Sequence, residues 1–519
     1  MPGGGLLALV SYGNQNVILN GNPEFTYFYK VFKRFSHFAM ENATIPLEGP
    51  NELFFDQPIR LRAKIPRIAD LVTDMTFVFD VPPIYSKWVN CSSAREAQYE
   101  FQWNNYIGAQ VLSNIAFFVG GNKIHEFDSD YIIAKAHADM DTDMIQKFRY
   151  LVGETPELTD PSNGMYAGGE LGKGYPSVFR DTTTQQQVNR PSIPGQTLYV
   201  PLPLWFSESM SKALPLVALQ YHECELQLTL RPIQELYTIL DPSGNRVRPG
   251  FRVAVPSPTK EIGQPDYVAD YDASGEIRAF LTDVGDTPPQ TNSWFFNPHI
   301  EASYVYLTDD ERKIFATTPL NYLVNQVSPF YFDTLYRREL FDLPITNPVS
   351  RLLLVPRRSD AYPYRNQVAN YTNWVIPTRG PHLPAQGVTI PQNKMFATGP
   401  LIPRTQPQII RSMRVLLDGN EIQEEKPVSY FTRVQPFRML NGASLPESQY
   451  LPSVNFSLTS PLDQPSGSVN ASRIRLFQLD IDPFDLPVNC TYIYTLLVYA
   501  ETINFFTVES GCGGIKFAL

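Results

Sequence analysis

Apolar and polar residues alternate along two similar stretches of the chain, residues 114–127 and 412–425. A period of two is typical of a β-strand with one buried face. The alternating apolar residues are Ile115, Phe117 and Val119 in the first stretch and Met413, Val415 and Leu417 in the second. A turn rich in Gly and Asn follows in each, and Ile124 or Ile422 then resumes the alternation. Each stretch is therefore predicted to form a β-hairpin.

The two hairpins share residues at a constant offset, which indicates an internal repeat. The identical pairs are Gly121/Gly419, Asn122/Asn420, Ile124/Ile422 and Glu126/Glu424. Unrelated hairpins can also look alike, because their turns draw on the same few residue types. We favour the first interpretation, two copies of one β-domain.

Other strand patterns support an all-β fold. Cys224 to Leu230 alternates and is predicted to be the last strand of the first domain, Ile300 to Tyr306 opens the second, and Tyr492 to Val508 ends it. The 46 prolines disfavour long helices and suit short strands joined by turns.

A chain of 519 residues exceeds what one hydrophobic core usually supports, so two domains are expected. The predicted organisation is an arm at 1–24, a first β-domain at 25–235, a proline-rich linker at 236–264 and a second β-domain at 265–519. Residues 153–196 and 331–405 lack a sustained period and are predicted to be large surface loops.

One helix is predicted, from Ser129 to Leu151, because apolar residues recur there every four positions. Within it, Asp139, Asp141 and Asp143 alternate like the start of a calcium loop. The pattern then fails, since the required Gly and Glu are replaced by Met144 and Tyr150. A solvated helix face is the favoured interpretation.

The composition disfavours several classes of protein and of binding site. A net charge of −10 disfavours a nucleic-acid coat, because DNA binding needs clustered Lys and Arg. The four cysteines are scattered, which indicates neither a zinc site nor a disulfide framework. We find no signal peptide and no apolar run of membrane-spanning length, so a soluble chain is expected despite six Asn-x-Ser/Thr sequons.

Basic and aromatic residues interleave between Glu24 and Met40, a composition that could grip a phosphate backbone. The favoured alternative is a buried first strand with a few solvated charges. No direct nucleic-acid binding is expected.

The sequence lacks several common catalytic motifs. There is no Gly-x-Ser-x-Gly elbow, His222-Glu223 lacks the second His of a zincin, and Gly169 to Gly174 lacks the Walker pattern. No catalytic, cofactor-binding or metal residue is predicted, and no cofactor. Two function classes remain: a structural shell protein, or a carbohydrate-binding or carbohydrate-cleaving β-sandwich protein whose aromatic loops would hold sugars.

Several blocks of the chain resemble the major capsid proteins of nucleocytoplasmic large DNA viruses. The N-terminal blocks are Gly3-Gly4-Gly5-Leu6, Leu9-Val10-Ser11-Tyr12-Gly13, Leu19-Asn20-Gly21-Asn22-Pro23 and residues 28–39. Further similarity lies at 65–80, 112–124, 214–223 and 510–519. The resemblance implies two tandem eight-stranded antiparallel jelly rolls and a virion protein that is not an enzyme.

The same resemblance implies the partners. The family forms pseudo-hexagonal trimers, the capsomers of an icosahedral shell, which also contact one another. Minor capsid proteins and penton proteins are further expected partners, and an internal membrane would lie near the arm. Assembly would take place in the host cytoplasm.

Overall fold

The computed structural model describes residues 3–30, 32–85, 88–89, 97–98, 100–159, 191, 193–240, 246–247, 277–282, 289, 291–361, 368–373, 408–439, 442, 445, 447–459, 464–486 and 492–517. The chain divides into two compact units, Met1–Phe38 and Ala39–Leu519.

The first unit contains two short helices, α1 (Gly4–Val10) and α2 (Asn14–Asn20), neither of which has a buried residue. The aromatic residues from Phe25 to Phe35 are also exposed, and the described backbone of this segment pairs only in an isolated bridge between Thr26 and Tyr29. The predicted buried first strand over this segment is therefore wrong. The first strand of the body, β1, begins at Phe38.

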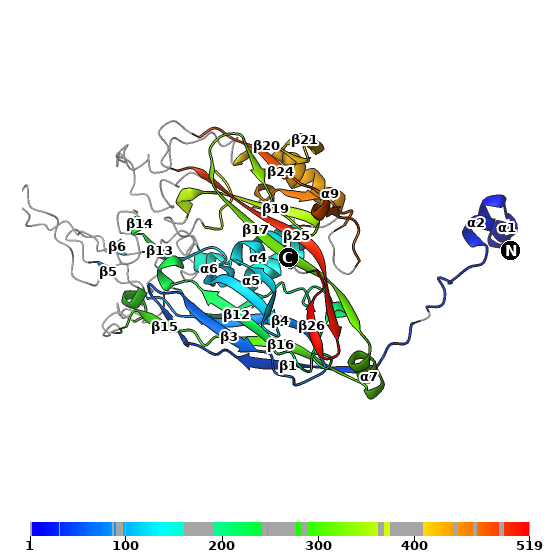
Figure 1. Ribbon diagram of the computed structural model, residues 1–519, viewed down its shortest axis with the longest axis horizontal. Coiled ribbons are helices and arrows are strands. Elements are labelled where there is room, and N and C mark those ends of the chain that lie inside the picture. The colour runs from blue at the N-terminus through cyan, green and yellow to red at the C-terminus, as the bar shows by residue number, and fades with distance from the viewer. Residues whose placement is uncertain are drawn as a thin grey trace, which may run out of the picture. The chain divides into compact units, whose positions relative to one another are not determined.

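The second unit contains two β-sandwiches (Figure 1). In the first, one sheet has the strand order β1-β16-β4-β10 and the other has β3-β12-β8-β9. In the second, the corresponding orders are β17-β25-β19-β22 and β18-β24-β20-β21. The eight strands of the first are β1 (Phe38–Pro46), β3 (Ile59–Lys64), β4 (Leu71–Val81), β8 (Leu112–Val119), β9 (Asn122–Phe127), β10 (Gln196–Pro201), β12 (Cys224–Leu230) and β16 (His299–Leu307). The eight of the second are β17 (Leu320–Leu335), β18 (Glu339–Asp342), β19 (Pro348–Arg358), β20 (Ile410–Leu417), β21 (Asn420–Pro427), β22 (Ser453–Asn455), β24 (Phe477–Pro483) and β25 (Tyr494–Glu509).

These two sets are the predicted tandem jelly rolls, which we call the first and second rolls. Each strand of the first roll has a counterpart in the second at the same place in its sheet and in the same order along the chain. Three smaller strands pair with strands of the rolls: β11 (Leu214–Pro215), β23 (Val469–Asn470) and β26 (Cys512–Ile515). The others form separate small sheets: β2 (Glu52–Phe54) with β15 (Ser293–Phe295), β5 (Trp88–Val89) with β6 (Ala97–Gln98), and β13 (Tyr237–Leu240) with both β7 (Glu100–Trp103) and β14 (Arg246–Val247).

Both predicted hairpins are present, β8–β9 and β20–β21. Each turn has two central residues with positive φ, Gly120 and Gly121 in the first and Asp418 and Gly419 in the second. Such angles match the right-handed twist of the strands that flank a two-residue turn. The alternating apolar residues of β8 and β20 are all buried, as expected.

The strand predicted at Ile300 to Tyr306 exists, but its assignment to the second domain is wrong. This strand, β16, pairs with β4 of the first roll, so β12 is not the last strand of that roll. The predicted linker also begins with a strand, because β13 pairs with β7. The helix α7 (Asp309–Thr317) follows β16 and precedes β17, and it is the connection between the two rolls.

The helix predicted from Ser129 to Leu151 is two helices, α4 (Ser129–Asp139) and α5 (Thr142–Leu151). The side chain of Asp141 accepts a hydrogen bond from the Met144 N–H at 2.7 Å and so caps a new helix. Shorter helices within the described residues are α3 (Ile107–Val111), α6 (Pro156–Thr159) and α9 (Gln435–Met439), which continues a π-helical turn, η7 (Tyr430–Val434). The prediction of a single helix is therefore wrong.

The surface loop predicted at 331–405 is wrong over its first part, because it contains the end of β17, all of β18 and the central strand β19. The predicted loop at 153–196 lies mostly outside the described residues.

Candidate functional site

The aspartates that alternate like the start of a calcium loop are not arranged as a cation site. Asp139 forms ion pairs with Lys135 and Arg351, whereas Asp141 caps α5. Among the described residues, no group of three or more His, Cys, Asp or Glu side chains is placed to hold a metal. His222 interacts through Nδ1 with the backbone of Gly513. Gly169 to Gly174 lies outside the described residues.

The most extensive polar arrangement joins the two rolls. Helix α4 of the first roll lies against β19, and β9 lies against β17, so these elements cover the outer face of the sheet β17-β25-β19. Figure 1 shows α4 and α5 between the strands of the first roll and those of the second. The Gln326 side chain of β17 donates a hydrogen bond to the Ile124 carbonyl of β9 at 3.0 Å. We call this contact the inter-roll interface.

Buried charges occupy the inter-roll interface. Arg351 of β19 forms ion pairs with Asp139 of α4 and with Glu501 of β25. Lys135 of α4 lies 3.7 Å from Glu501, and the Tyr131 hydroxyl donates to Glu501 at 2.8 Å. Burial disfavours the ionised form of Glu501, but Arg351 and Lys135 outweigh that effect and lower the pKa of its carboxyl. The charged state of the cluster is therefore stabilised in the fold.

A second charged pair lies beside the first, between Asp130 of α4 and Arg357 of β19. Asp128, directly before α4, accepts hydrogen bonds from the hydroxyls of Tyr499 and Tyr331. Lys135 of α4 and Glu501 of β25 form a pair of the opposite sense, so the helix has only a net negative charge and the sheet face beneath it only a net positive one. Such buried ion pairs favour a single arrangement of the two rolls, because separating a pair leaves a buried charge without compensation.

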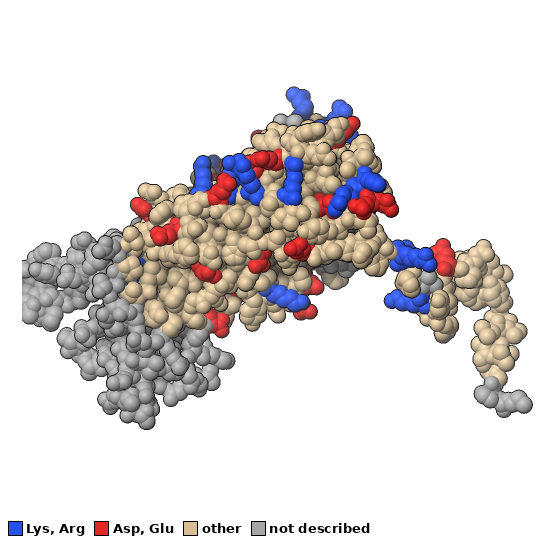
Figure 2. Space-filling view, turned by 90° about the horizontal axis from the view of Figure 1, so that it is seen from below, with Lys and Arg blue, Asp and Glu red and all other residues tan. Residues whose placement is uncertain are grey.

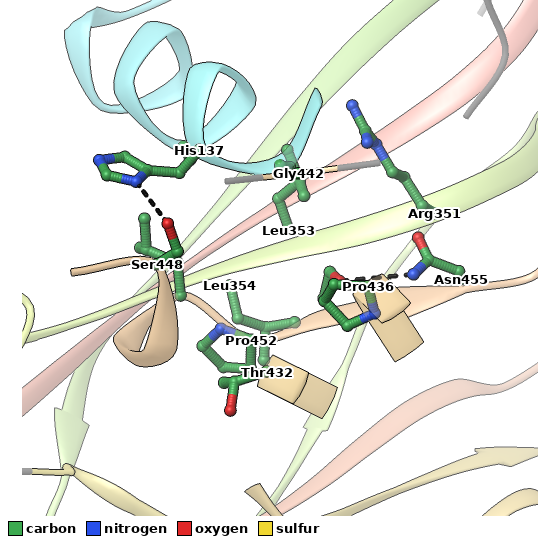
Figure 3. Close-up of a pocket in the computed structure, with 14 residues that line it drawn as sticks. His137, Arg351, Leu353, Leu354, Thr432, Pro436, Gly442, Ser448, Pro452 and Asn455 are labelled. Carbon is green, nitrogen blue, oxygen red and sulfur yellow. Dashed lines mark hydrogen bonds between the residues drawn. The ribbon is translucent and has the colours of Figure 1, made fainter. Parts of the chain in front are cut away.

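A small cavity lies between α4, β19 and the segment 432–455 (Figure 3). Its volume is about 40 Å³. Ser448 Oγ lies 2.9 Å from His137 Nδ1 at its wall, and the Tyr106 hydroxyl lies 3.2 Å from the other ring nitrogen. Burial lowers the pKa of His137 to about 4, so the ring is neutral. The cavity has room for one or a few water molecules and is too small for a sugar ring.

Another buried carboxyl stands at the end of α5. Glu154 accepts a hydrogen bond from the Tyr106 N–H at 2.5 Å and from the Asn105 amide at 3.1 Å. Burial raises the pKa of Glu154 to about 7. Arg149, which lies nearby, reaches across to Glu447 of the second roll at 3.1 Å. Glu154 is therefore hydrogen-bonded within the first roll, and the pair Arg149–Glu447 is a further polar contact between the rolls.

Sequence reasoning missed the inter-roll interface. Arg351, Arg357 and Arg358 are all buried, although arginines normally indicate a solvated segment. The signal that could have found β19 is the apolar run from Leu352 to Val355, which is typical of a strand covered on both faces.

Two family models match the chain. Residues 26–258 match the major capsid protein N-terminus, and residues 311–514 match the large eukaryotic DNA virus major capsid protein. The second match begins inside α7, where the strand pairing separates the rolls.

Relatives match over the whole length. The chain is 24% identical to the major capsid protein of Phaeocystis pouchetii virus, with 99% of each chain covered. It is also 24% identical to the major capsid protein of Paramecium bursaria Chlorella virus 1, again with 99% of each covered.

The fold agrees with a solved structure. The PBCV-1 virus capsid chain superimposes with a TM-score of 0.63 at 20% identity, covering 95% of this chain and 100% of that one. The relatives are capsid proteins, which supports a structural role without enzymatic activity and does not favour the carbohydrate alternative. The chain belongs to the family of major capsid proteins of large eukaryotic DNA viruses.

Proposed function

We propose that this chain is the repeating unit of an icosahedral viral shell and that it works as a trimer with pseudo-hexagonal outline. The observation that carries the proposal is the repetition of one jelly roll twice in the chain, with the same strand order in each sheet. Three chains then supply six similar wedges, so a threefold particle can occupy a sixfold position in a lattice. Association of such units stops when the ring of three chains is complete.

The test is the mass of the purified chain in solution. Size-exclusion chromatography with light scattering at micromolar concentration is expected to give three times the chain mass of 58.8 kDa. Class averages from electron microscopy should show a six-lobed outline with threefold symmetry. A monomer at all concentrations up to those of a virus-producing cell contradicts the proposal.

The partners beyond the trimer form a second part of the proposal. Contacts between capsomers, and with minor capsid and penton proteins, complete the shell. The arm at 1–24 is the segment proposed to reach an inner partner, minor capsid protein or internal membrane, because its apolar side chains are exposed. Assembly takes place in the cytoplasm of the host. Fluorescence imaging of the tagged chain in infected cells, and crosslinking of purified particles, test these two points.

A further inference from the structure

The repeat places the same surface twice in each chain, but the fold covers it only once. In the first roll, the strand β9 is covered by β17 of the second roll, and Ile124 is 3% exposed. The counterpart strand β21 is the outer strand of its sheet, and Ile422, the repeat partner of Ile124, is 47% exposed. The two isoleucines thus hold equivalent places in the repeat but differ in exposure.

The helical segments that follow these strands differ in the same way. Helix α4 follows β9 and packs on β19, with most of its residues buried. The segment η7–α9 follows β21 and is buried on the side of β22 by Phe431, Thr432 and Gln435. Its other side is exposed, and Phe437 there is 79% exposed. Ile422 of β21 and Phe437 of α9 are thus two exposed apolar side chains on elements that follow each other, and β21 contacts η7.

The receiving surface is also present twice. The outer face of β17-β25-β19 is covered by the first roll, whereas the counterpart face of β1-β16-β4 is open at Asp74 and Glu301. These two carboxylates lie on adjacent strands, because Asp74 pairs with Ser303 and Thr76 with Glu301. Strand β1 is exposed along most of its length.

On the open surfaces, the acidic and basic partners are exchanged relative to the inter-roll interface. Inside the chain, Asp130 and Asp139 of α4 meet Arg351 and Arg357 of β19, and the pair Lys135–Glu501 has the opposite sense, so the helix is net acidic and the sheet net basic. On the open surfaces, the helical segment is basic, with exposed Arg433 and Arg438, and the sheet is acidic. Figure 2 looks from below β1 and β16 of Figure 1, and acidic side chains are scattered over the middle of the body with few basic ones among them.

The carboxylates of β21 itself do not oppose this polarity. Glu421 pairs with Arg414, Glu425 pairs with Arg338 and Glu424 pairs with Lys426, all within the second roll. The sign of the open helical surface is therefore set by Arg433 and Arg438.

We propose that β21 and the exposed side of η7–α9 dock on the outer face of β1-β16-β4 of a second copy of this chain, head to tail. The contact repeats the inter-roll interface between chains with its charges exchanged. This assignment rests on the proposed trimer and names the surfaces that close it. The exchanged polarity also provides specificity, because a helical segment placed on the wrong sheet meets like charge.

The apolar part is tested with Ile422→Asp in the full chain. The expected result is loss of the trimer peak in light scattering at micromolar concentration. The two rolls of the resulting monomer should remain folded, with the melting temperature of the wild-type chain. The matched control is Leu340→Asp, since Leu340 is 48% exposed on β18, the opposite outer strand of the same sheet. The control should remain a trimer.

The charged part is tested by reversal and rescue. Arg433→Glu with Arg438→Glu, or Asp74→Arg with Glu301→Arg, should each abolish the trimer. All four changes in one chain should restore it, which a merely misfolded variant cannot do. Arg60→Glu with Lys64→Glu on β3 is the control for two reversed charges on the other sheet, and it should leave the trimer intact.

The outcomes separate this assignment from the proposed function. A wild-type chain that is monomeric overturns both. A wild-type trimer that persists in Ile422→Asp and in both pairs of reversed charges overturns only the assigned surfaces. Reversals that abolish the trimer without rescue by the fourfold variant overturn the exchanged-charge pairing.

Discussion

Gly121 and Gly419 occupy the same position in the two repeated turns, and both have a φ of +82°. A Cβ at either position would meet no atom within 4 Å, so the space around them is open. The backbone angle alone therefore requires glycine there, because a β-branched residue is strained at positive φ.

We predict that Gly121→Val and Gly419→Val each destabilise the fold by about 1–3 kcal/mol. A lowered melting temperature by calorimetry and a reduced yield of trimer are the expected results. Gly514→Val is the control, since a Cβ there also meets no atom within 4 Å and its φ is not positive. Equal melting temperatures for the turn variants and the wild type would show that the turns tolerate side chains.

His125 of β9 is a buried histidine whose two ring nitrogens have no hydrogen-bond partner among the described residues. Burial and the nearby Lys135 lower the pKa of His125 to about 3, although Glu501 opposes the shift. The folded pKa lies below the ordinary value of 6.5. Its contribution to stability is thus complete above about pH 6.5 and is lost as pH falls toward about 3.

We predict that His125→Leu makes the melting temperature less sensitive to acid over that range. It should not lower stability at pH 7, because the substitution removes unpaired polar atoms from the core. His137, with a pKa lowered to about 4, still contributes acid sensitivity, so part of the effect remains. The control is His37→Leu in the exposed segment before β1. A variant and wild type with parallel pH profiles would contradict the assignment to His125.

At the scale of elements, β19 shows why a strand rich in arginine can be central in a sheet. Leu352 and Leu354 point into the core of the second roll, whereas Leu353 and Val355 belong to the core of the first. Arg351 and Arg357 lie on the same face of the strand as Leu353 and Val355, and they meet the carboxylates of α4 there. The strand is therefore buried on both faces, and its charges are neutralised from another roll.

Removal of one partner from this cluster tests its role. Arg351→Met is expected to cost about 3–5 kcal/mol, because Glu501 and Asp139 remain buried with less compensation. Adding Glu501→Gln should recover part of that loss. Differential scanning calorimetry provides the measurement.

Arg411→Met is the matched control for this experiment. Arg411 forms ion pairs with Asp482 and Asp485 on an exposed surface, where such pairs contribute about 0–1 kcal/mol. If both arginine variants lose the same stability, the buried cluster has no special role in joining the rolls.

At the scale of the whole molecule, the arm is notable for apolar side chains that are exposed. Its helices expose Leu6, Leu7 and Leu9 in α1 and Ile18 and Leu19 in α2. A segment of this kind gains stability only when a partner covers it. No helix in the described part of the chain is long and apolar enough to cross a membrane.

We predict that deletion of Pro2 to Asn22 leaves soluble trimers of near-normal melting temperature that fail to form closed shells. Light scattering, calorimetry and electron microscopy of assembly reactions provide the measurements. Loss of the trimer would place the arm in the trimer itself. Complete particles from the truncated chain would exclude it as an assembly contact.

Elements whose signals are local could be predicted from the amino-acid sequence. Alternation predicted β8, β12, β20 and β25, and the Gly and Asn residues of the two turns predicted both hairpins and their repetition. These features depend on neighbours within a few residues, so periodicity and turn chemistry are sufficient to identify them.

The division of the elements between the two rolls depends on pairing between distant parts of the chain. β16 follows β12 after a long insertion, and its pairing with β4 depends on a partner more than 200 residues earlier in the chain. The buried arginines of β19 likewise depend on carboxylates of α4, far away in sequence. Burial and ion pairing act through space, and for this reason no local pattern could reveal the boundary at α7 or the interface that joins the two rolls.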